Sequence, residues 1–225
     1  MAAKKFSISR STERPAEPHW PAFIAMVAVG GLYAALPSYL VGGAPRWLLA
    51  VAVLGLTLPI IIFRRSGNHR MSQLFGYILN SVVTAALVFS LGLLIKEVTE
   101  HRVPPEQLLR SAAALWFANV IIFASWYWRL DAGGPHQRSL TPGHTDGAFL
   151  FPQMTMHPEA KLAAGEQEWE PRFVDYLFLA FNTSTAFSPT DVPVLSRWAK
   201  MLMMIQAVIS LVVIALLAGR AVNIL

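Results

Sequence analysis

Long apolar runs separated by short polar breaks dominate the chain. Five of these runs approach the roughly 20 residues that an α-helix needs to cross the hydrocarbon layer of a membrane. They cover roughly 21–41, 46–63, 72–95, 108–128 and 198–219. The pattern therefore predicts five firm membrane-spanning helices joined by polar segments.

A sixth apolar segment lies between the fourth and the last of these runs. It covers Phe173–Phe187, which is about 15 residues and hence about 22 Å of α-helix. This length is short for a full crossing and about right for a half-helix. The predicted fold class is an all-α polytopic transmembrane helical bundle, with five firm helices plus a short hydrophobic helix that is re-entrant or barely spanning.

The polar breaks divide the chain into four parts. Residues 1–19 form a polar N-terminal tail that we expect to be mobile, and 20–128 form a four-helix transmembrane region. Residues 129–172 form a long extramembrane loop, and 173–225 hold the short helix, a turn and the final span. The long loop keeps apolar clusters at 149–152 and at Trp169, so we expect a packed flap.

The overall composition is that of an integral membrane protein. Of 225 residues, 55% are hydrophobic and only 14% are charged, with a mean hydropathy of +0.48. The net charge of +5 does not indicate a nucleic-acid partner, because the basic residues gather at membrane edges. They are Lys4, Lys5, Arg10 and Arg14 before the first run, and Arg64, Arg65 and Arg70 after the second. This distribution predicts a cytoplasmic N-terminus and a lipid bilayer as the partner.

The sequence offers little catalytic or metal-binding chemistry. It contains no cysteine, which excludes disulfides, thiol nucleophiles and thiolate metal ligands. His136, His144 and His157 in the long loop match no spacing typical of metal ligands. Neither a nucleophile with a neighbouring base nor a pair of carboxylates stands out. We therefore predict no enzyme activity, no cofactor and no metal site.

A hydroxyl-rich run follows the short apolar segment and is the main candidate for function. A short apolar helix, a polar turn, an acid and a long apolar helix form the layout of a pore loop, because non-helical backbone at membrane depth must be satisfied by protein or water. The candidate constriction residues are Thr183, Ser184, Thr185, Ala186, Phe187, Ser188 and Asp191. In the alternative, the hydroxyls bond to carbonyls one turn back, and 188–191 is an ordinary turn that caps the last helix.

The last fifty or so residues resemble the pore-helix, filter and inner-helix half of the two-helix potassium channels. The resemblance runs from Asp175-Tyr176-Leu177-Phe178 through Thr185 and Asp191 into the final helix. It implies a pore lined by several copies of the chain, with a tetramer as the assembly. Phe187 and Pro189 stand where the potassium filter has glycines, so potassium selectivity is not expected.

The whole chain also resembles a family of bacterial polytopic inner-membrane proteins whose function is uncharacterised. The strings that carry this resemblance are Trp126–Pro135, Phe149–Met154, and Tyr176–Asp191 followed by Leu195-Ser196-Arg197. The resemblance implies a multi-pass protein of the bacterial inner membrane. It supplies no reaction.

Several polar residues interrupt the apolar runs. Asn80, Asn119, Gln206 and Ser210 lie inside predicted spans, where we expect them to form hydrogen bonds between helices. Arg129 and Asp131 follow the aromatic belt at the end of the fourth run, and we expect them to pair at the membrane boundary.

Two hypotheses for function remain. In the first, the protein has ion-channel-like pore-loop architecture and conducts small ions or solutes as an oligomer through 183–191. In the second, it is a non-conducting structural or assembly protein whose loop 129–172 binds a partner.

Overall fold

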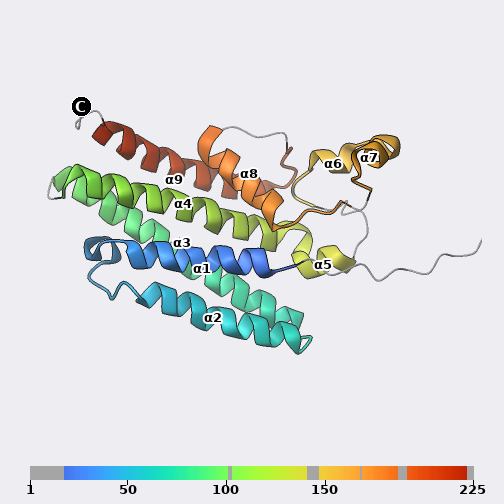
Figure 1. The fold of residues 1–225 in the computed structure, drawn as a ribbon, viewed down its shortest axis with the longest axis horizontal. Coiled ribbons are helices and arrows are strands. Elements are labelled where there is room, and N and C mark those ends of the chain that lie inside the picture. Colours follow the sequence, from blue (N-terminus) through green and yellow to red (C-terminus); the bar gives the residue numbers. More distant parts are fainter. Residues whose placement is uncertain (1–17, 101–102, 141–146, 168, 187–191, 222–225) are drawn as a thin grey trace, which may run out of the picture.

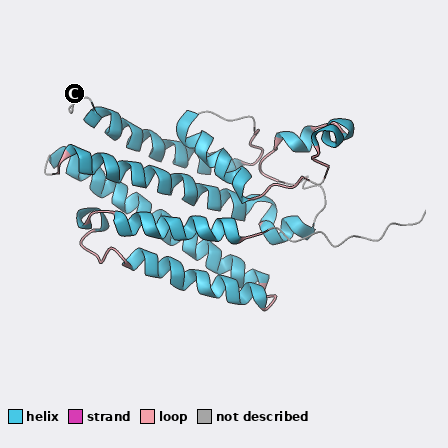
Figure 2. Ribbon diagram, viewed as in Figure 1, coloured by secondary structure: helices cyan, strands magenta, loops and turns pink. Residues whose placement is uncertain are grey.

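A computed structural model describes residues 18–100, 103–140, 147–167, 169–186 and 192–221, and shows a bundle of long helices side by side (Figure 1). The long helices are α1 (Trp20–Ala35), α2 (Leu48–Arg65), α3 (His69–Glu100), α4 (Pro105–Leu130) and α9 (Arg197–Ala221). The short elements are η1 (Ser38–Val41), η2 (Asp131–Gly133), α5 (Pro135–Leu140), α6 (Pro152–Thr155), α7 (Pro158–Ala164) and α8 (Phe173–Ala186). Over the described ranges no β-strand is formed, so the predicted all-α class is confirmed (Figure 2).

Four of the helices are long and apolar enough to cross a membrane: α2, α3, α4 and α9. Many of their large apolar side chains point outward, including Leu58, Phe89 and Val208. Exposed apolar side chains on this scale are unfavourable in water and suit contact with lipid. These helices therefore fit an integral membrane protein.

The first predicted span is shorter than its apolar run. Helix α1 has 16 residues, about 24 Å, and ends at Ala35 because Leu36 and Pro37 adopt extended backbone. The 3₁₀ turn η1 continues the run, and the Ser90 hydroxyl on α3 donates a hydrogen bond to the carbonyl of Leu40 at 2.8 Å. The run 21–41 is thus a helix followed by a turn held against α3.

Helices α8 and α9 begin at the same end of the bundle. The ring of Phe149 lies 6.1 Å from that of Tyr176 near the start of α8, and 6.1 Å from that of Trp198 at the start of α9. Backbone hydrogen bonds tie 148–150 to 193–195, with Leu195 N donating to Ala148 O at 2.8 Å. Helix α8, about 21 Å long, enters the bundle, and the chain has returned to the same end by residue 193 (Figure 1). Helices α8 and α9 thus both run from this end of the bundle toward the other, and of the two only α9 is long enough to cross a membrane.

The long loop covers the end of the bundle where α4 stops. Within its described part, η2, α5, α6 and α7 form short helices that the sequence did not reveal. Phe149 and Phe151 are buried, and the ring of Phe151 packs 5.6 Å from that of Trp169. The described part of the loop is thus a packed layer. The predicted N-terminal tail falls mostly on 1–17, outside the described residues.

We call this covered end the basic end. It is where α1 begins, α2 ends, α3 begins and α4 ends, and it carries Arg64, Arg65, His69, Arg129 and His136. The opposite end carries η1, Arg46 and the charged last turn of α3, where Lys96 and Glu100 lie 3.9 Å apart.

Candidate functional site

The hydroxyl-rich run is helical as far as it is described. The short helix predicted over Phe173–Phe187 is present as α8, which ends at Ala186, so the candidate constriction residues Thr183, Ser184, Thr185 and Ala186 lie in its last turns. The Thr183 hydroxyl donates to the carbonyl of Leu179 at 2.8 Å, and Thr185 donates to Phe181 at 3.0 Å. Because each hydroxyl is satisfied one turn back, the run can stay helical in an apolar setting. Phe187, Ser188 and Asp191 lie outside the described residues.

A buried polar cluster joins α8 to α9 and α4. Gln206 Nε2 donates to Ala180 O and to Ser184 Oγ, both at 2.7 Å, and Gln206 Oε1 accepts a hydrogen bond from the Tyr127 hydroxyl. One helical turn further along α9, Ser210 Oγ accepts a hydrogen bond from Asn119 Nδ2 at 2.8 Å. Four of these side chains have no exposed surface: Asn119, Gln206, Ser210 and Ser184. This cluster fixes the depth of α8 in the bundle.

A second buried hydrogen bond joins α3 to α4. Asn80 Oδ1 accepts from the Ser125 hydroxyl at 3.0 Å, and both side chains are fully buried. One turn away on the outer side, Trp126 Nε1 donates to Thr84 Oγ1 at 2.9 Å. All four predicted intramembrane polar residues therefore make contacts between helices.

Arg129 and Asp131 do not pair as the sequence predicts. Asp131 is fully buried toward α8 and the loop, where Oδ2 accepts from the Tyr176 hydroxyl at 2.6 Å and Oδ1 accepts from the backbone N–H of Ala148 at 2.5 Å. Arg129 instead lies against Gly76 on α3. Positions two residues apart on a helix point to different faces, which explains the separation.

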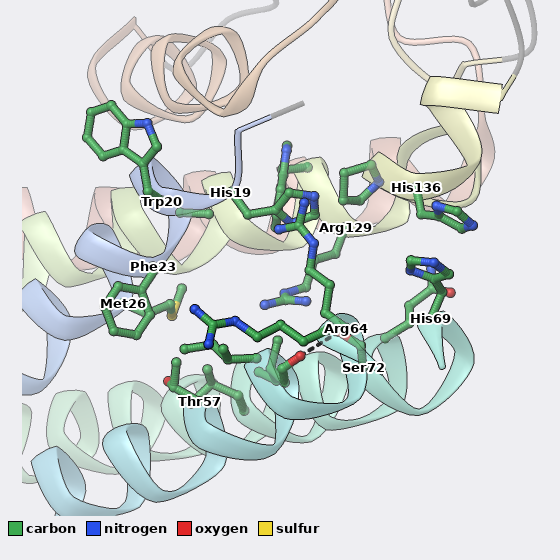
Figure 3. Close-up of a pocket in the computed structure, with 18 of the residues that line it drawn as sticks. His19, Trp20, Phe23, Met26, Thr57, Arg64, His69, Ser72, Arg129 and His136 are labelled. Carbon is green, nitrogen blue, oxygen red and sulfur yellow. Dashed lines mark hydrogen bonds between the residues drawn. The ribbon is translucent and has the colours of Figure 1, made fainter. Parts of the chain in front are cut away.

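A pocket of about 530 Å³ opens at the basic end between α1, α2, α3, α4 and α5 (Figure 3). Its polar part is formed by cationic, histidine, amide and hydroxyl side chains: His19, Arg64, Arg65, His69, Ser72, Gln73, Arg129, His136 and Ser139. Its apolar part is formed mainly by Trp20, Phe23, Met26, Ile60, Ile61, Leu79 and Trp128. Of the described residues that line the pocket, none is Asp or Glu.

Gly76 makes room for the guanidinium of Arg129. A Cβ at this position would lie 1.9 Å from Nη1 of Arg129, so no other residue fits here without moving the arginine. The guanidinium also lies 5.4 Å from the ring centre of Trp128. Its Nε is buried without a hydrogen-bond partner, and no described residue forms an ion pair with it. A guanidinium whose Nε is buried and unsatisfied is costly unless a ligand supplies the missing acceptor.

Three histidines line the pocket, and the surroundings of His19 and His136 disfavour their charged forms. The rings of His69 and His136 stack with centroids 3.5 Å apart, and the ring of His19 packs edge-on 5.0 Å from that of Trp128. Burial, the larger cause, and repulsion from nearby cations, the smaller one, together lower the pKa of His19 to about 3. Burial, together with repulsion from His69 and Arg64, also lowers the pKa of His136.

The pocket could not be recognised from sequence spacing. Arg64 and Arg65 follow one apolar run, His69 precedes the next, and Arg129 follows a third. Taken singly, each of these residues is therefore interpreted as lying at the edge of the membrane. Only the packing of four helices and α5 brings them together. Among the described residues no group of three His, Asp or Glu side chains gathers in metal-binding geometry. When the chain is compared with models of protein families, with curated proteins and with solved structures, nothing matches.

Proposed function

We propose that this membrane protein binds an anion in the pocket at its basic end. The observation that carries the proposal is the guanidinium of Arg129, which packs on Gly76 with its Nε buried and unsatisfied and with no carboxylate among the described pocket residues. An anion would supply the acceptor and the opposite charge that this group lacks.

The chemistry of the pocket favours an oxyanion of the phosphate, sulfate or carboxylate type. A guanidinium presents a planar fork of N–H donors that matches two oxygens of such a group. Arg64 and Arg65 line the same pocket and add positive charge near Arg129. The side-chain amide of Gln73 is already engaged, since Nε2 donates to Tyr77 Oη at 2.9 Å and to Gly133 O at 2.7 Å. The arginines therefore provide the recognition.

The direct test is calorimetric titration of the purified protein with sulfate. We expect saturable binding that weakens about tenfold or more in Arg129→Gln, because charge-assisted hydrogen bonds are lost. Arg46→Gln is the matched control, since Arg46 is exposed at the opposite end of the bundle. Equal affinity of wild type and Arg129→Gln for sulfate would show that the anion does not bind at Arg129 in this pocket.

We expect sulfate binding to strengthen as the pH falls from about 7.5 to about 5.5. Sulfate keeps its charge over this range, whereas an anion in the pocket raises the pKa of His136 and promotes protonation of its ring. His19, with a pKa of about 3, stays neutral over the same range. The groups that face His19 are Arg64, Arg129, Arg138 and His136, and those that face His136 include His69 and Arg64. A gain of about threefold to tenfold in sulfate affinity corresponds to a rise of up to about one unit in the pKa of His136 when the anion binds.

The stability of the ligand-free protein should decrease as the pH falls, whereas sulfate affinity should increase. The pKa of His19 is about 3 in the folded protein and about 6.5 in the unfolded chain, so the unfolded state binds the proton first. Stability is therefore lost as the pH falls below about 6.5. Sulfate affinity that stays constant or declines toward low pH would contradict the role of His136 in the pH dependence of binding.

Ion conduction is a second candidate, favoured by the common starting end of α8 and α9. This arrangement agrees with the resemblance to the pore-loop half of potassium channels, and a pathway would require several copies, for which a tetramer is the expected assembly. The test is ion flux into liposomes, repeated with Thr185→Val and Asp191→Asn. We expect altered flux in both variants if 183–191 lines the pathway, whereas absent flux from a verified oligomer favours a non-conducting protein.

We also propose the orientation of the protein. The basic end carries the start of α1, the α2–α3 turn and the long loop, and positive charge next to spans favours the cytoplasmic side. If α1 and η1 together make one crossing beside α2, α3, α4 and α9, the protein crosses five times. This places the N-terminus and the pocket in the cytoplasm of a bacterium and the C-terminus on the other face of its inner membrane.

A further inference from the structure

The pocket has two chemically different halves stacked along the bundle axis. Its charged half lies at the basic end, at the level where α2 ends and α4 ends. Its apolar half reaches Thr57, eight residues before the end of α2, and Leu79, ten residues into α3. At 1.5 Å per residue, the pocket therefore extends roughly 12–15 Å into the spans.

The apolar half opens sideways between α1 and α2. Toward the opposite end these helices touch closely, because a Cβ on Gly30 would lie 3.2 Å from the Cα of Ala50. Toward the basic end they are separated by the pocket, which Phe23 and Met26 of α1 line (Figure 3). Ile61 of α2 also lines it. Phe23 and Ile61 are also 38% and 36% exposed on the surface that faces lipid. The pocket thus has a lateral opening toward the hydrocarbon layer.

We infer that the occupant of this pocket is an anionic membrane lipid, with its phosphate at Arg129 and an acyl chain leaving between α1 and α2. The inference rests on the proposed function and names the class of its ligand. A soluble oxyanion would use the charged half and leave the apolar half empty, whereas an amphiphile matches both. A volume of about 530 Å³ suits a head group and the first part of a chain, so the remaining hydrocarbon would lie in the bilayer.

The position of Trp20 indicates that the charged half of the pocket lies at the level of the lipid head groups. Trp20 lines the pocket at the first residue of α1 and is 65% exposed. Tryptophan is typical of the level of the lipid head groups. The charged half therefore meets the layer in which lipid phosphates reside, and a lipid can enter without leaving the membrane.

The test compares lipid and sulfate binding in variants that fill only the apolar half. Retained phosphatidylglycerol and phosphatidylcholine are measured by native mass spectrometry, and sulfate by calorimetry. Ile61→Trp and Met26→Phe narrow the lateral opening, while Leu58→Trp is the control, because Leu58 is exposed on the same helix and does not line the pocket.

We expect wild type and Leu58→Trp to retain phosphatidylglycerol in preference to phosphatidylcholine. Arg129→Gln should lose both that preference and sulfate binding. Ile61→Trp and Met26→Phe should weaken phosphatidylglycerol binding about tenfold or more while sulfate affinity stays within about twofold of wild type, which also shows that the variants fold.

Two results would overturn the inference in distinguishable ways. If both filling variants retain phosphatidylglycerol as well as wild type does, while sulfate binding still depends on Arg129, the ligand is a soluble oxyanion and the proposed function stands. If the wild type binds no sulfate and shows no preference between the two lipids, the proposed function fails together with the inference.

Discussion

Arg129→Met is expected to make the ligand-free protein more stable while it abolishes sulfate binding. The guanidinium packs on Gly76 with its Nε buried and donating no hydrogen bond, and no described residue forms an ion pair with it, so its removal relieves a desolvation cost. A methionine keeps an unbranched apolar stem in the same space. We expect the free energy of unfolding to rise by about 1–3 kcal/mol. Reversible unfolding in mixed detergent micelles, without added anion, measures the change.

Two comparisons make this result specific. Arg129→Lys keeps the charge but loses the planar fork, so it should bind sulfate more weakly without the gain in stability. Arg46→Met at the opposite end should change stability by no more than about 0.5 kcal/mol, as exposed substitutions usually do. A clear loss of stability in Arg129→Met would show that the arginine supports the fold, and would remove the main reason for proposing a ligand.

Gln206→Leu is expected to give the largest loss of stability among single polar substitutions in the bundle. The amide donates to Ala180 O and Ser184 Oγ at 2.7 Å each and accepts from the Tyr127 hydroxyl. Leucine removes all three hydrogen bonds and leaves buried groups on α8 and α4 unsatisfied. We expect a loss of about 2–4 kcal/mol in the free energy of unfolding.

The loss should be concentrated in α8. Because Gln206 is the main polar link between α8 and α9, hydrogen exchange over 173–186 should accelerate in Gln206→Leu before exchange in α3 does. Ser210→Ala is the matched control, since it removes one hydrogen bond from Asn119 and should cost about 1 kcal/mol. Uniform acceleration across all helices, or a stability equal to that of Ser210→Ala, would mean that the cluster does not hold α8 in place.

The long helices were predictable because the bilayer imposes a minimum length on apolar runs. The runs 46–63 and 198–219 differ from α2 and α9 by one or two residues at each end. The ends of α3 extend further than its apolar run, since polar residues such as Lys96 and Glu100 support the helix in water. Helix α1 is shorter than its run because Pro37 cannot continue it.

The path of α8 and the composition of the pocket were not predictable from local pattern. A 14-residue apolar helix fits either a crossing or a re-entrant segment. The contact of Phe149 with Trp198, 49 positions downstream, helps to bring the starts of α8 and α9 to the same end of the bundle. Arg129 was predicted to pair with Asp131 because they are neighbours in sequence. The side chain of Arg129 instead points toward Gly76 on α3, where the absence of a Cβ leaves room for the guanidinium.

The central claim is that the pocket at the basic end holds an anion on Arg129, and anomalous X-ray scattering tests it most directly. Crystals of the protein grown with selenate, the heavier analogue of sulfate, are measured at the selenium absorption edge. We predict an anomalous peak within hydrogen-bonding distance of the Arg129 guanidinium, and no peak there in Arg129→Met. A pocket without such a peak at saturating selenate, with selenium found only on the protein surface, would contradict the claim.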